Sequence, residues 1–233
     1  MEDIKQISIS EENYPELLKE IPDAPKILYF KGEMKKSEPC LAIVGTRQYS
    51  SYGRQAAFDI SKAAADSGII IVSGLAPGID TFAHTAAVKR NKRTIAVLGT
   101  GLDERSMYPK ENILLSRKIL KAGGCLVSEY PPGTLGARYT FPRRNRIIAG
   151  FSLGVLIVES KQIGGSMITA SFALTYKRKL FAMPGSIYTL NTKGPHHLIK
   201  NGAKLVDNIY DILKELNLTD LKIKDEAHQM KIY

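Results

Sequence analysis

The sequence predicts an α/β protein whose mostly parallel β-sheet carries helices on both faces. From residue 41 onward, short apolar runs rich in β-branched residues alternate with helical patterns, and this repetition is typical of parallel sheets. Hydrophobic residues make up 44% of the 233-residue chain, enough for a substantial core. The chain has no apolar run of about 18 residues, so we expect no membrane-spanning helix.

The expected elements follow the apolar runs and the helical periodicity. Strands are expected at residues 41–44, 69–73, 94–98, 125–128, 154–158 and 179–182, with a last edge strand at 204–206. Helices are expected at residues 53–67, 81–89, 110–122, 142–152, 166–177 and, capped by Asn208, 209–216. Ligands of such sheets bind beyond the carboxyl ends of the strands. The Gly, Ser, Thr and Glu residues that end these strands therefore predict a polar crevice.

Three segments are expected along the chain. Residues 1–39 form a small appendage, with a short helix that starts at Ser10 or Glu11 and an extended stretch at 27–30 that docks onto a larger domain. Residues 40–217 form the α/β domain, and residues 218–233 form a charged tail without a clear period, which we expect to be mobile. The N-terminus lacks the basic and apolar regions of a secretory signal. Together with Cys40 and Cys125, expected as buried reduced thiols, this predicts a cytoplasmic protein.

The first candidate site is the turn Gly45-Thr46-Arg47, which follows a buried strand and precedes a helix. Glycine permits a tight turn and a close approach of ligand to backbone. The amides of a helix N-terminus attract phosphate, and Arg47 adds a cationic fork. The alternative is an ordinary strand-to-helix turn with a surface arginine.

The second candidate site is the stretch 138–150, where Arg143, Arg144 and Arg146 lie in or beside the first turn of a helix expected to start at Pro142. Cations at this end oppose the helix dipole, which predicts an anion or buried carboxylates beside them. The rings of Tyr139 and Phe141 next to these cations suit single-stranded nucleic acid, whose bases stack while its phosphates pair.

A structural interpretation of the same stretch stays open. Phe141 could serve as a hydrophobic staple, and one or two arginines could pair with Glu129 or Glu159. We expect at least one of the arginines to be structural in this sense, and the two glutamates to orient arginines.

A third candidate site is the stretch 164–170, where Gly164 and Gly165 open a helix after a strand and could cradle another phosphate. The formal net charge of +10 favours a polyanionic partner, although a lysine-rich solvated surface would produce the same value.

The chain resembles the DprA/Smf family of DNA-processing proteins from about residue 14 to about residue 207. The resemblance rests on ordered blocks of residues: Tyr14-Pro15, 28–32, 44–47 with Tyr52-Gly53, 73–80 with Ala83-His84, 96–99, Tyr108-Pro109, Ser128-Glu129, Phe141-Pro142, 144–150, Gly165-Ser166 with 168–170, Pro184-Gly185 and 198–203. It implies an extended Rossmann-like domain that binds single-stranded DNA, forms a homodimer and helps to load the RecA recombinase during natural transformation.

Carried over position by position, the resemblance implies that Arg47 contacts phosphate and that Phe141 touches a base. Arg138 matches a basic position of the family, and Arg144 and Arg146 would line the same pocket. The candidate DNA-binding residues are Gly45, Thr46, Arg47, Arg138, Phe141, Arg143, Arg144, Asn145, Arg146, Gly165 and Ser166. Candidate dimer surfaces are the apolar part of residues 209–216 and the stretch 174–178.

Two departures from the family pattern matter. Many relatives carry a winged-helix domain after the Rossmann core, whereas a short charged tail follows Leu216 here, so the functions of that domain are not carried over. At 195–197 the family more often has Asn before the Leu-Ile pair, where this chain has His197. We assign no role to that change.

An enzyme that cleaves nucleoside monophosphates, of the cytokinin-activating phosphoribohydrolase type, is the main alternative. Such enzymes use a Gly-Gly-x-Gly-Thr-x-x-Glu turn. Aligning its glycines with Gly164 and Gly165 places Met167 and Ile168 at Gly-Thr and Ser171 at the catalytic Glu. The missing carboxylate disfavours this chemistry.

Other catalytic and ligand sites are disfavoured too. Ser73, Asp80 and His84 could suggest a triad, but Asp80 fits better as a helix N-cap and the sequence has no nucleophile elbow. The first strand is not followed by Gly-x-Gly-x-x-Gly, so we expect no dinucleotide cofactor. His196, His197 and His228 have no metal-ligand spacing, so no metal is expected either.

Overall fold

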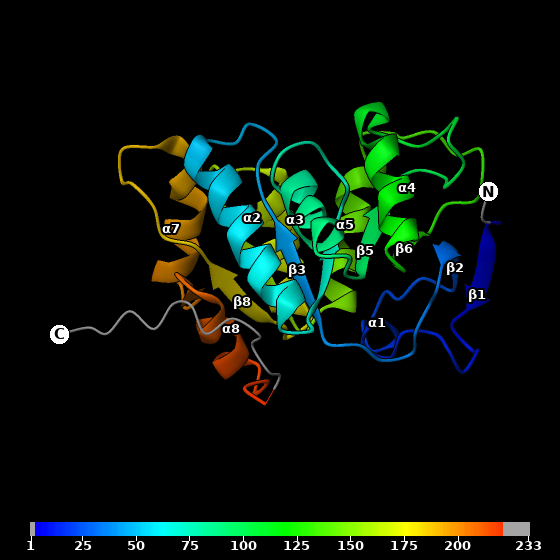
Figure 1. Ribbon diagram of the computed structural model, residues 1–233, viewed down its shortest axis with the longest axis horizontal. Helices are drawn as coiled ribbons and strands as arrows, with labels where there is room; N and C mark the ends of the chain where they lie inside the picture. The colour runs from blue at the N-terminus through cyan, green and yellow to red at the C-terminus, as the bar shows by residue number, and fades with distance from the viewer. Residues whose placement is uncertain (1–2, 221–233) are drawn as a thin grey trace.

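The computed structural model describes residues 3–220, and in this part of the chain one nine-stranded sheet runs through the molecule (Figure 1). The strand order is β1-β2-β6-β5-β4-β3-β7-β8-β9. Along this order, all neighbouring strands from β6 to β9 pair in parallel. Strand β2 pairs antiparallel with both of its neighbours, β1 and β6. The strands are β1 (Lys5–Ser8), β2 (Ile27–Gly32), β3 (Cys40–Val44), β4 (Ile70–Ser73), β5 (Thr94–Leu98), β6 (Cys125–Ser128), β7 (Gly154–Ile157), β8 (Lys179–Ala182) and β9 (Lys204–Leu205).

Helices cover both faces of the sheet. One face carries α2, α3, α4 and α8, and the other carries α1, α5, α6 and α7. The helices are α1 (Glu16–Lys19), α2 (Ser51–Asp66), α3 (Ile79–Lys89), α4 (Ile113–Lys121), α5 (Thr140–Phe151), α6 (Gly165–Thr175), α7 (Lys193–Lys200) and α8 (Ile209–Glu215), with 3₁₀ turns η1 (Lys110–Asn112) and η2 (Leu190–Thr192).

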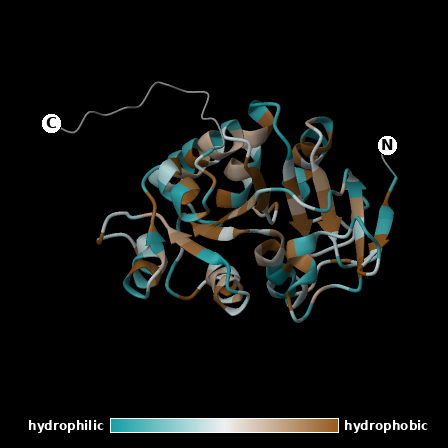
Figure 2. Ribbon diagram, turned by 90° about the horizontal axis from the view of Figure 1, so that it is seen from below, coloured by the Kyte–Doolittle hydropathy of each residue, from teal (hydrophilic) through white to brown (hydrophobic). Residues whose placement is uncertain are grey.

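The central strand β3 explains why the sheet needs both helical layers. Successive side chains of a strand point to opposite faces. Leu41 and Ile43 accordingly pack with α2 and α3, while Ala42 and Val44 pack with α5 and α6. All five residues of β3 are buried, as expected for a parallel strand covered on both sides. Figure 2 shows the apolar strands enclosed between helices whose outer faces are hydrophilic.

The predicted α/β class and the six main strands are confirmed, with ends that differ by one residue at most. Asn208 caps α8 with a capping box, also as predicted. The helix expected at 110–122 is divided into η1 and α4, and α5 begins at Thr140, two residues before Pro142. The last strand is shorter than expected, and β1 and α7 were not predicted. Most of the tail expected at 218–233 lies outside the described residues.

The N-terminal segment joins the main sheet. Tyr29 and Phe30 of β2 pair with Ser128 and Val127 of β6, so the stretch expected to dock becomes a strand of the sheet. The domain boundary expected at residue 39 stays a prediction.

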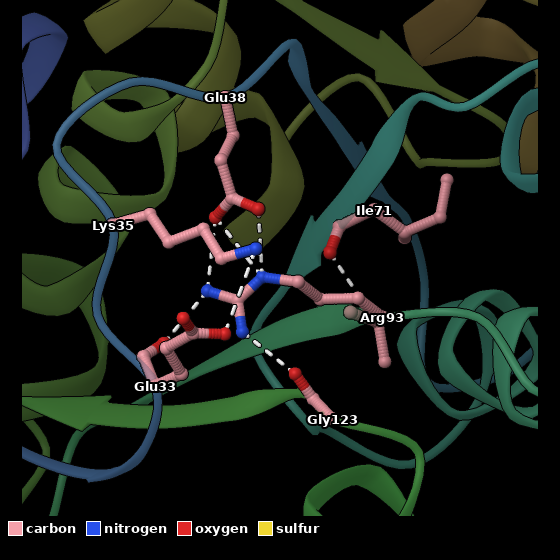
Figure 3. Close-up of polar contacts among 7 residues, drawn as sticks. Glu33, Lys35, Glu38, Ile71, Arg93 and Gly123 are labelled. Atoms are coloured by element: carbon pink, nitrogen blue, oxygen red, sulfur yellow. Dashed lines mark hydrogen bonds and ion pairs between the residues drawn. The ribbon is translucent and has the colours of Figure 1, made fainter.

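The connection from β2 to β3 is held by Arg93 (Figure 3). Its guanidinium donates to both carboxylate oxygens of Glu38, at 2.8–3.0 Å, and to the carbonyls of Glu33 and Gly123, both at 2.7 Å. The side chains of Arg93 and Glu38 are both about nine-tenths buried. This cluster lies at the amino ends of the parallel strands and fixes the N-terminal segment to the core.

Candidate nucleic-acid interface

The strand order reverses at β3 and β7, and polar turns follow both strands. Chain order continues on one side of β3 through β4, β5 and β6, and on the other side of β7 through β8 and β9. Parallel sheets bind ligands where the order reverses, beyond the carboxyl ends of the strands. The Gly45–Arg47 turn after β3 and the segment 158–166 after β7 meet here, and the Thr46 amide donates to the Glu159 carbonyl at 2.7 Å.

Arg47 and Phe141 come together at this edge of the sheet. Arg47 is exposed, and its guanidinium carbon lies 5.9 Å from the centroid of the Phe141 ring. Gly78, at φ +88°, lies against the turn, because a Cβ there would be 2.4 Å from the Thr46 carbonyl oxygen. The structure thus places a cation beside an aromatic ring, the pairing expected for binding nucleotides.

Two glycines and a tyrosine surround the Phe141 ring. A Cβ on Gly99 or Gly136 would lie 2.9 Å or 2.7 Å from ring carbons of Phe141. The Tyr108 ring lies 5.5 Å from the Phe141 ring, centroid to centroid, and is itself partly exposed. Tyr108 was not predicted as a contact residue, although an aromatic ring before Pro109 in the resembling blocks was available as a signal.

Asp103 joins the two loops that carry the residues around the Phe141 ring. Its carboxylate accepts from the Ser106 hydroxyl, from the Ser106 amide at 3.0 Å and from the Gly133 amide at 2.6 Å. The Ser106 hydroxyl and these amides lower the pKa of Asp103 to about 2. The loops 99–109 and 130–137 are therefore held to each other next to Phe141.

Arg144 lies beneath the interface, and only 5% of its surface is exposed. Its guanidinium donates to the carbonyls of Gly74, at 2.6 Å, and Val97; Gly74 directly follows β4, and Val97 is the second-last residue of β5. Burial lowers the pKa of Arg144 to about 10, and the nearby charge of Asp80 opposes that shift, so Arg144 is cationic at neutral pH. Arg144 binds strand ends and has little surface for a ligand.

Arg146 is also interior, with 3% of its surface exposed. It pairs with Glu129 on β6's loop and lies 3.5 Å from the Asp23 carboxylate of the N-terminal segment. Arg143 is exposed and lies 3.3 Å from the other Glu129 oxygen. The expectation that at least one of these arginines is structural is confirmed, and Glu129 orients two of them. The structure does not bring Arg146 to the rim of the pocket, where we expected it.

Glu159 has a different role from the one expected. Its buried carboxylate accepts from the Ser50 amide at 3.0 Å and the Ser50 hydroxyl at 2.5 Å, and within the described residues no arginine forms an ion pair with it. It supplies negative charge at the start of α2, where the helix dipole favours it. Phosphate binding at this turn would therefore depend on Arg47 more than on the first amides of α2.

The remaining candidates lie around α5 and α6. Arg138 and Tyr139 are exposed just before α5. The side-chain amide of Asn145 donates through Nδ2 to the Gly165 carbonyl at 3.1 Å and so links the two helices. A Cβ on Gly165 would meet no atom within 4 Å, whereas the Ser166 hydroxyl is buried and bonded to the Ser160 hydroxyl at 2.8 Å.

The buried groups near β4 do not form a catalytic triad. The Ser73 hydroxyl donates to the Ile43 carbonyl at 2.7 Å, and His84 Nδ1 lies 2.8 Å from the Thr94 hydroxyl. Asp80 accepts from the Gly74 amide and lies inside the first turn of α3, so the prediction that it caps this helix is wrong. Burial lowers the pKa of His84 to about 3, so this ring is neutral at physiological pH. The described residues contain no cluster suited to a metal ion and no helix long and apolar enough to cross a membrane.

Comparisons with known proteins identify relatives of this chain. Residues 5–217 match the family described as DNA recombination-mediator protein A. The chain is 42% identical over 215 residues to a DNA processing protein DprA of Bacillus subtilis, covering 91% of this chain and 71% of that protein.

Two solved structures are similar throughout. The X-ray structure of DNA processing protein A from Streptococcus pneumoniae has a TM-score of 0.84 at 42% identity, and the match covers 91% of this chain and 74% of that one. A Helicobacter pylori DNA processing protein A, described for its single-stranded DNA binding mode, has a TM-score of 0.81 at 29% identity. That match covers 95% of this chain and all of the other.

Proposed function

Because the chain belongs to the DNA recombination-mediator protein A family, which includes the DprA and Smf proteins, we propose that it binds single-stranded DNA along the carboxyl ends of its parallel strands. The observation that carries this proposal is the exposed guanidinium of Arg47 beside the Phe141 ring. Its Helicobacter pylori relative is described as binding single-stranded DNA, which supports the same activity here.

We assign direct and indirect roles according to exposure. Arg47, Arg138 and Arg143 neutralise phosphates, because their side chains are exposed. Phe141 and Tyr108 stack on bases. The turn residues Gly45 and Thr46 and the open start of α6 at Gly165 let the backbone of the strand approach closely. Arg144, Asn145, Arg146 and Ser166 position these groups from beneath.

We also propose the wider role of the family for this chain: it protects incoming single strands in the cytoplasm and helps to load the RecA recombinase in natural transformation. It acts as a binding protein and not as a nucleotide-cleaving enzyme, since Ser171 replaces the carboxylate that such cleavage needs.

We propose that the protein forms a homodimer, but over a different surface from the apolar side of α8. Ile209, Ile212 and Leu213 are buried in the core of the same chain. Leu174 on α6 and Tyr210 on α8 are exposed and free to contact a second copy. Leu174 belongs to the stretch 174–178, the second candidate from the sequence.

The decisive experiment is salt-titrated binding to single-stranded and duplex oligonucleotides of one sequence. The affinity for single strands should fall with salt, with a log–log slope of about −0.7 per phosphate neutralised. Equal or tighter binding to the duplex would contradict the proposal. Incubation with AMP should release no adenine, and release would favour the phosphoribohydrolase alternative.

A further inference from the structure

The loop between β8 and α7 presents apolar side chains to solvent. Tyr188 is 91% exposed, and its neighbours Ile187 and Leu190 are 63% and 68% exposed. Ile163, on the adjacent loop before α6, is 93% exposed. Single exposed apolar residues need no explanation, but a group of them on one ordered loop indicates a binding surface.

Hydrogen bonds within the loop hold this exposed tip in place. The Ser186 carbonyl accepts from the Thr189 amide at 3.3 Å and from the hydroxyls of Thr189, at 3.1 Å, and Thr192, at 2.5 Å. At the base of the loop, His196 Nε2 donates to the Gly185 carbonyl at 3.0 Å. Tyr188 is therefore presented by a formed turn, which reduces the entropy lost when a ligand binds.

The loop is connected to the proposed DNA interface. The side-chain amide of Asn191 donates through Nδ2 to the carbonyl of Gln48, the residue after Arg47, at 2.7 Å. The Asn191 carbonyl accepts from the Ser160 amide, in the turn after β7, at 2.6 Å. In Figure 1 the loop arches beside the start of α2, at the same end of the sheet as the Arg47 turn.

The charge around the loop favours a polyanion over a protein surface of mixed charge. The segment 160–206 contains no Asp or Glu and has seven Lys or Arg residues. Lys161 and Lys193 are exposed beside the loop, and Lys193 Nζ donates to the Ile187 carbonyl at 2.9 Å. The neighbouring Glu159 is buried and bonded to Ser50, so the exposed ring lies among cations, which suits the base and phosphate of an unpaired nucleotide.

We propose that the 185–193 loop is a second contact for the same DNA strand, on which Tyr188 stacks a base while Lys161 and Lys193 pair with phosphates. This inference rests on the proposed function, because it extends the strand that contacts Arg47 and Phe141. Ile187 and Leu190 flank the stacked base and exclude water from it.

The chain has no tryptophan, so one introduced tryptophan reports on the loop alone. Stacking on a base should quench the fluorescence of Tyr188→Trp as oligothymidylate is added, with the same midpoint as binding measured independently. The control Leu114→Trp, at an exposed position on α4, should not be quenched. A Tyr188→Trp signal that stays constant while the protein binds DNA would overturn the inference.

Oligonucleotide length separates the two contacts, since small single-strand-binding folds occupy roughly 4–16 nucleotides. Tyr188→Ala should weaken binding of an oligothymidylate of about 30 nucleotides by about tenfold, the effect of one lost stacked base, and Tyr188→Phe should bind like wild type. Oligomers too short to span the Arg47 site and the loop should bind Tyr188→Ala and wild type equally.

Each outcome has a distinct meaning. If wild type binds no single strand, the proposed function fails. If wild type binds and Tyr188→Ala binds the long oligomer equally well, only the loop contact fails. If Tyr188→Ala changes the oligomeric state in gel filtration and leaves DNA affinity unchanged, the loop contacts a second copy of the chain and the inference is overturned.

Discussion

Arg47 and Phe141 should act on DNA together, and their separate contributions can be measured. Phe141→Ala removes a base-stacking ring and should cost roughly 1–3 kcal/mol of binding free energy. Arg47→Ala removes a phosphate contact, so it should weaken all sequences about equally and reduce the salt slope by about 0.7. Phe141→Ala should leave the slope unchanged, because its ring carries no charge.

The double variant tests whether the pair acts as a unit. The guanidinium lies 5.9 Å from the ring centroid, at the outer limit of a cation–π contact, and Arg47 is exposed. The coupling should therefore be about 0.5–1 kcal/mol, with the double variant losing less than the sum of the two single variants. Fluorescence anisotropy with labelled oligothymidylate at several salt concentrations measures the binding of the wild type, the two single variants and the double variant.

A second cation–π pair provides the matched control. Lys89 Nζ, on α3, lies 5.2 Å from the ring of Phe58 on α2, and neither residue belongs to the proposed interface. Lys89→Ala and Phe58→Ala should bind DNA like wild type. If Arg47→Ala retains both the wild-type affinity and the wild-type salt slope, the assignment of Arg47 to phosphate is refuted.

Three further predictions address the surroundings. Gly136→Ala should lower DNA affinity with little change in thermal stability, since its Cβ would displace the Phe141 ring tip, and anisotropy together with a melting curve would separate the two effects. Arg93→Met should lower the free energy of unfolding by about 3–5 kcal/mol in urea, because it leaves Glu38 buried without its partner, while DNA affinity stays unchanged. His84 has an unfolded pKa of 6.5 and a folded pKa of about 3, so the unfolded chain binds more protons between these values and stability falls as pH drops below 6.5. At pH 5 this loss is about 2 kcal/mol, and His84→Gln should lack it in urea titrations at pH 7.5 and 5.

These predictions fail in recognisable ways. A Gly136→Ala variant with unchanged affinity would mean that the Phe141 ring position does not matter for binding. If Arg93→Met unfolds at the wild-type urea concentration, the Glu38 cluster contributes no net stability. An equal loss of stability at pH 5 in wild type and His84→Gln would assign the acid sensitivity to other groups.

The parallel sheet could be predicted because its strands are short, continuous apolar runs. Residues 41–44 and 154–158 have the composition of strands buried on both faces, and the structure places them side by side at the centre. Their adjacency could not be predicted, since nothing local encodes the strand order. The meeting of the Arg47 turn with Glu159 follows from that order. β1 was missed because its four residues alternate weakly, with only Ile7 buried.

The three arginines of α5 form one cluster in the sequence and separate in the structure. Helical residues are spaced by about 100°, so Arg144 is turned away from Arg143, whereas Arg143 and Arg146, three residues apart, lie on one side of the helix and both contact Glu129. Arg144 shares the spacing i, i+3, i+4, i+7 with Ile147, Ile148 and Phe151, the buried face of α5. This periodicity was available as a signal that Arg144 faces the sheet.

A cation on the buried face of a helix must find acceptors there, and the ends of the parallel strands provide them. The carbonyls of Gly74 and Val97 lie where β4 and β5 end, and Arg144 binds both. An unpaired buried carbonyl costs free energy, so one guanidinium satisfies two such groups and holds two strand ends at a fixed distance. Phe141, one turn earlier on α5, is placed by the same anchor. The arginines that looked like one anion site thus divide into an inner group that fixes the helix and an exposed group left to bind phosphate.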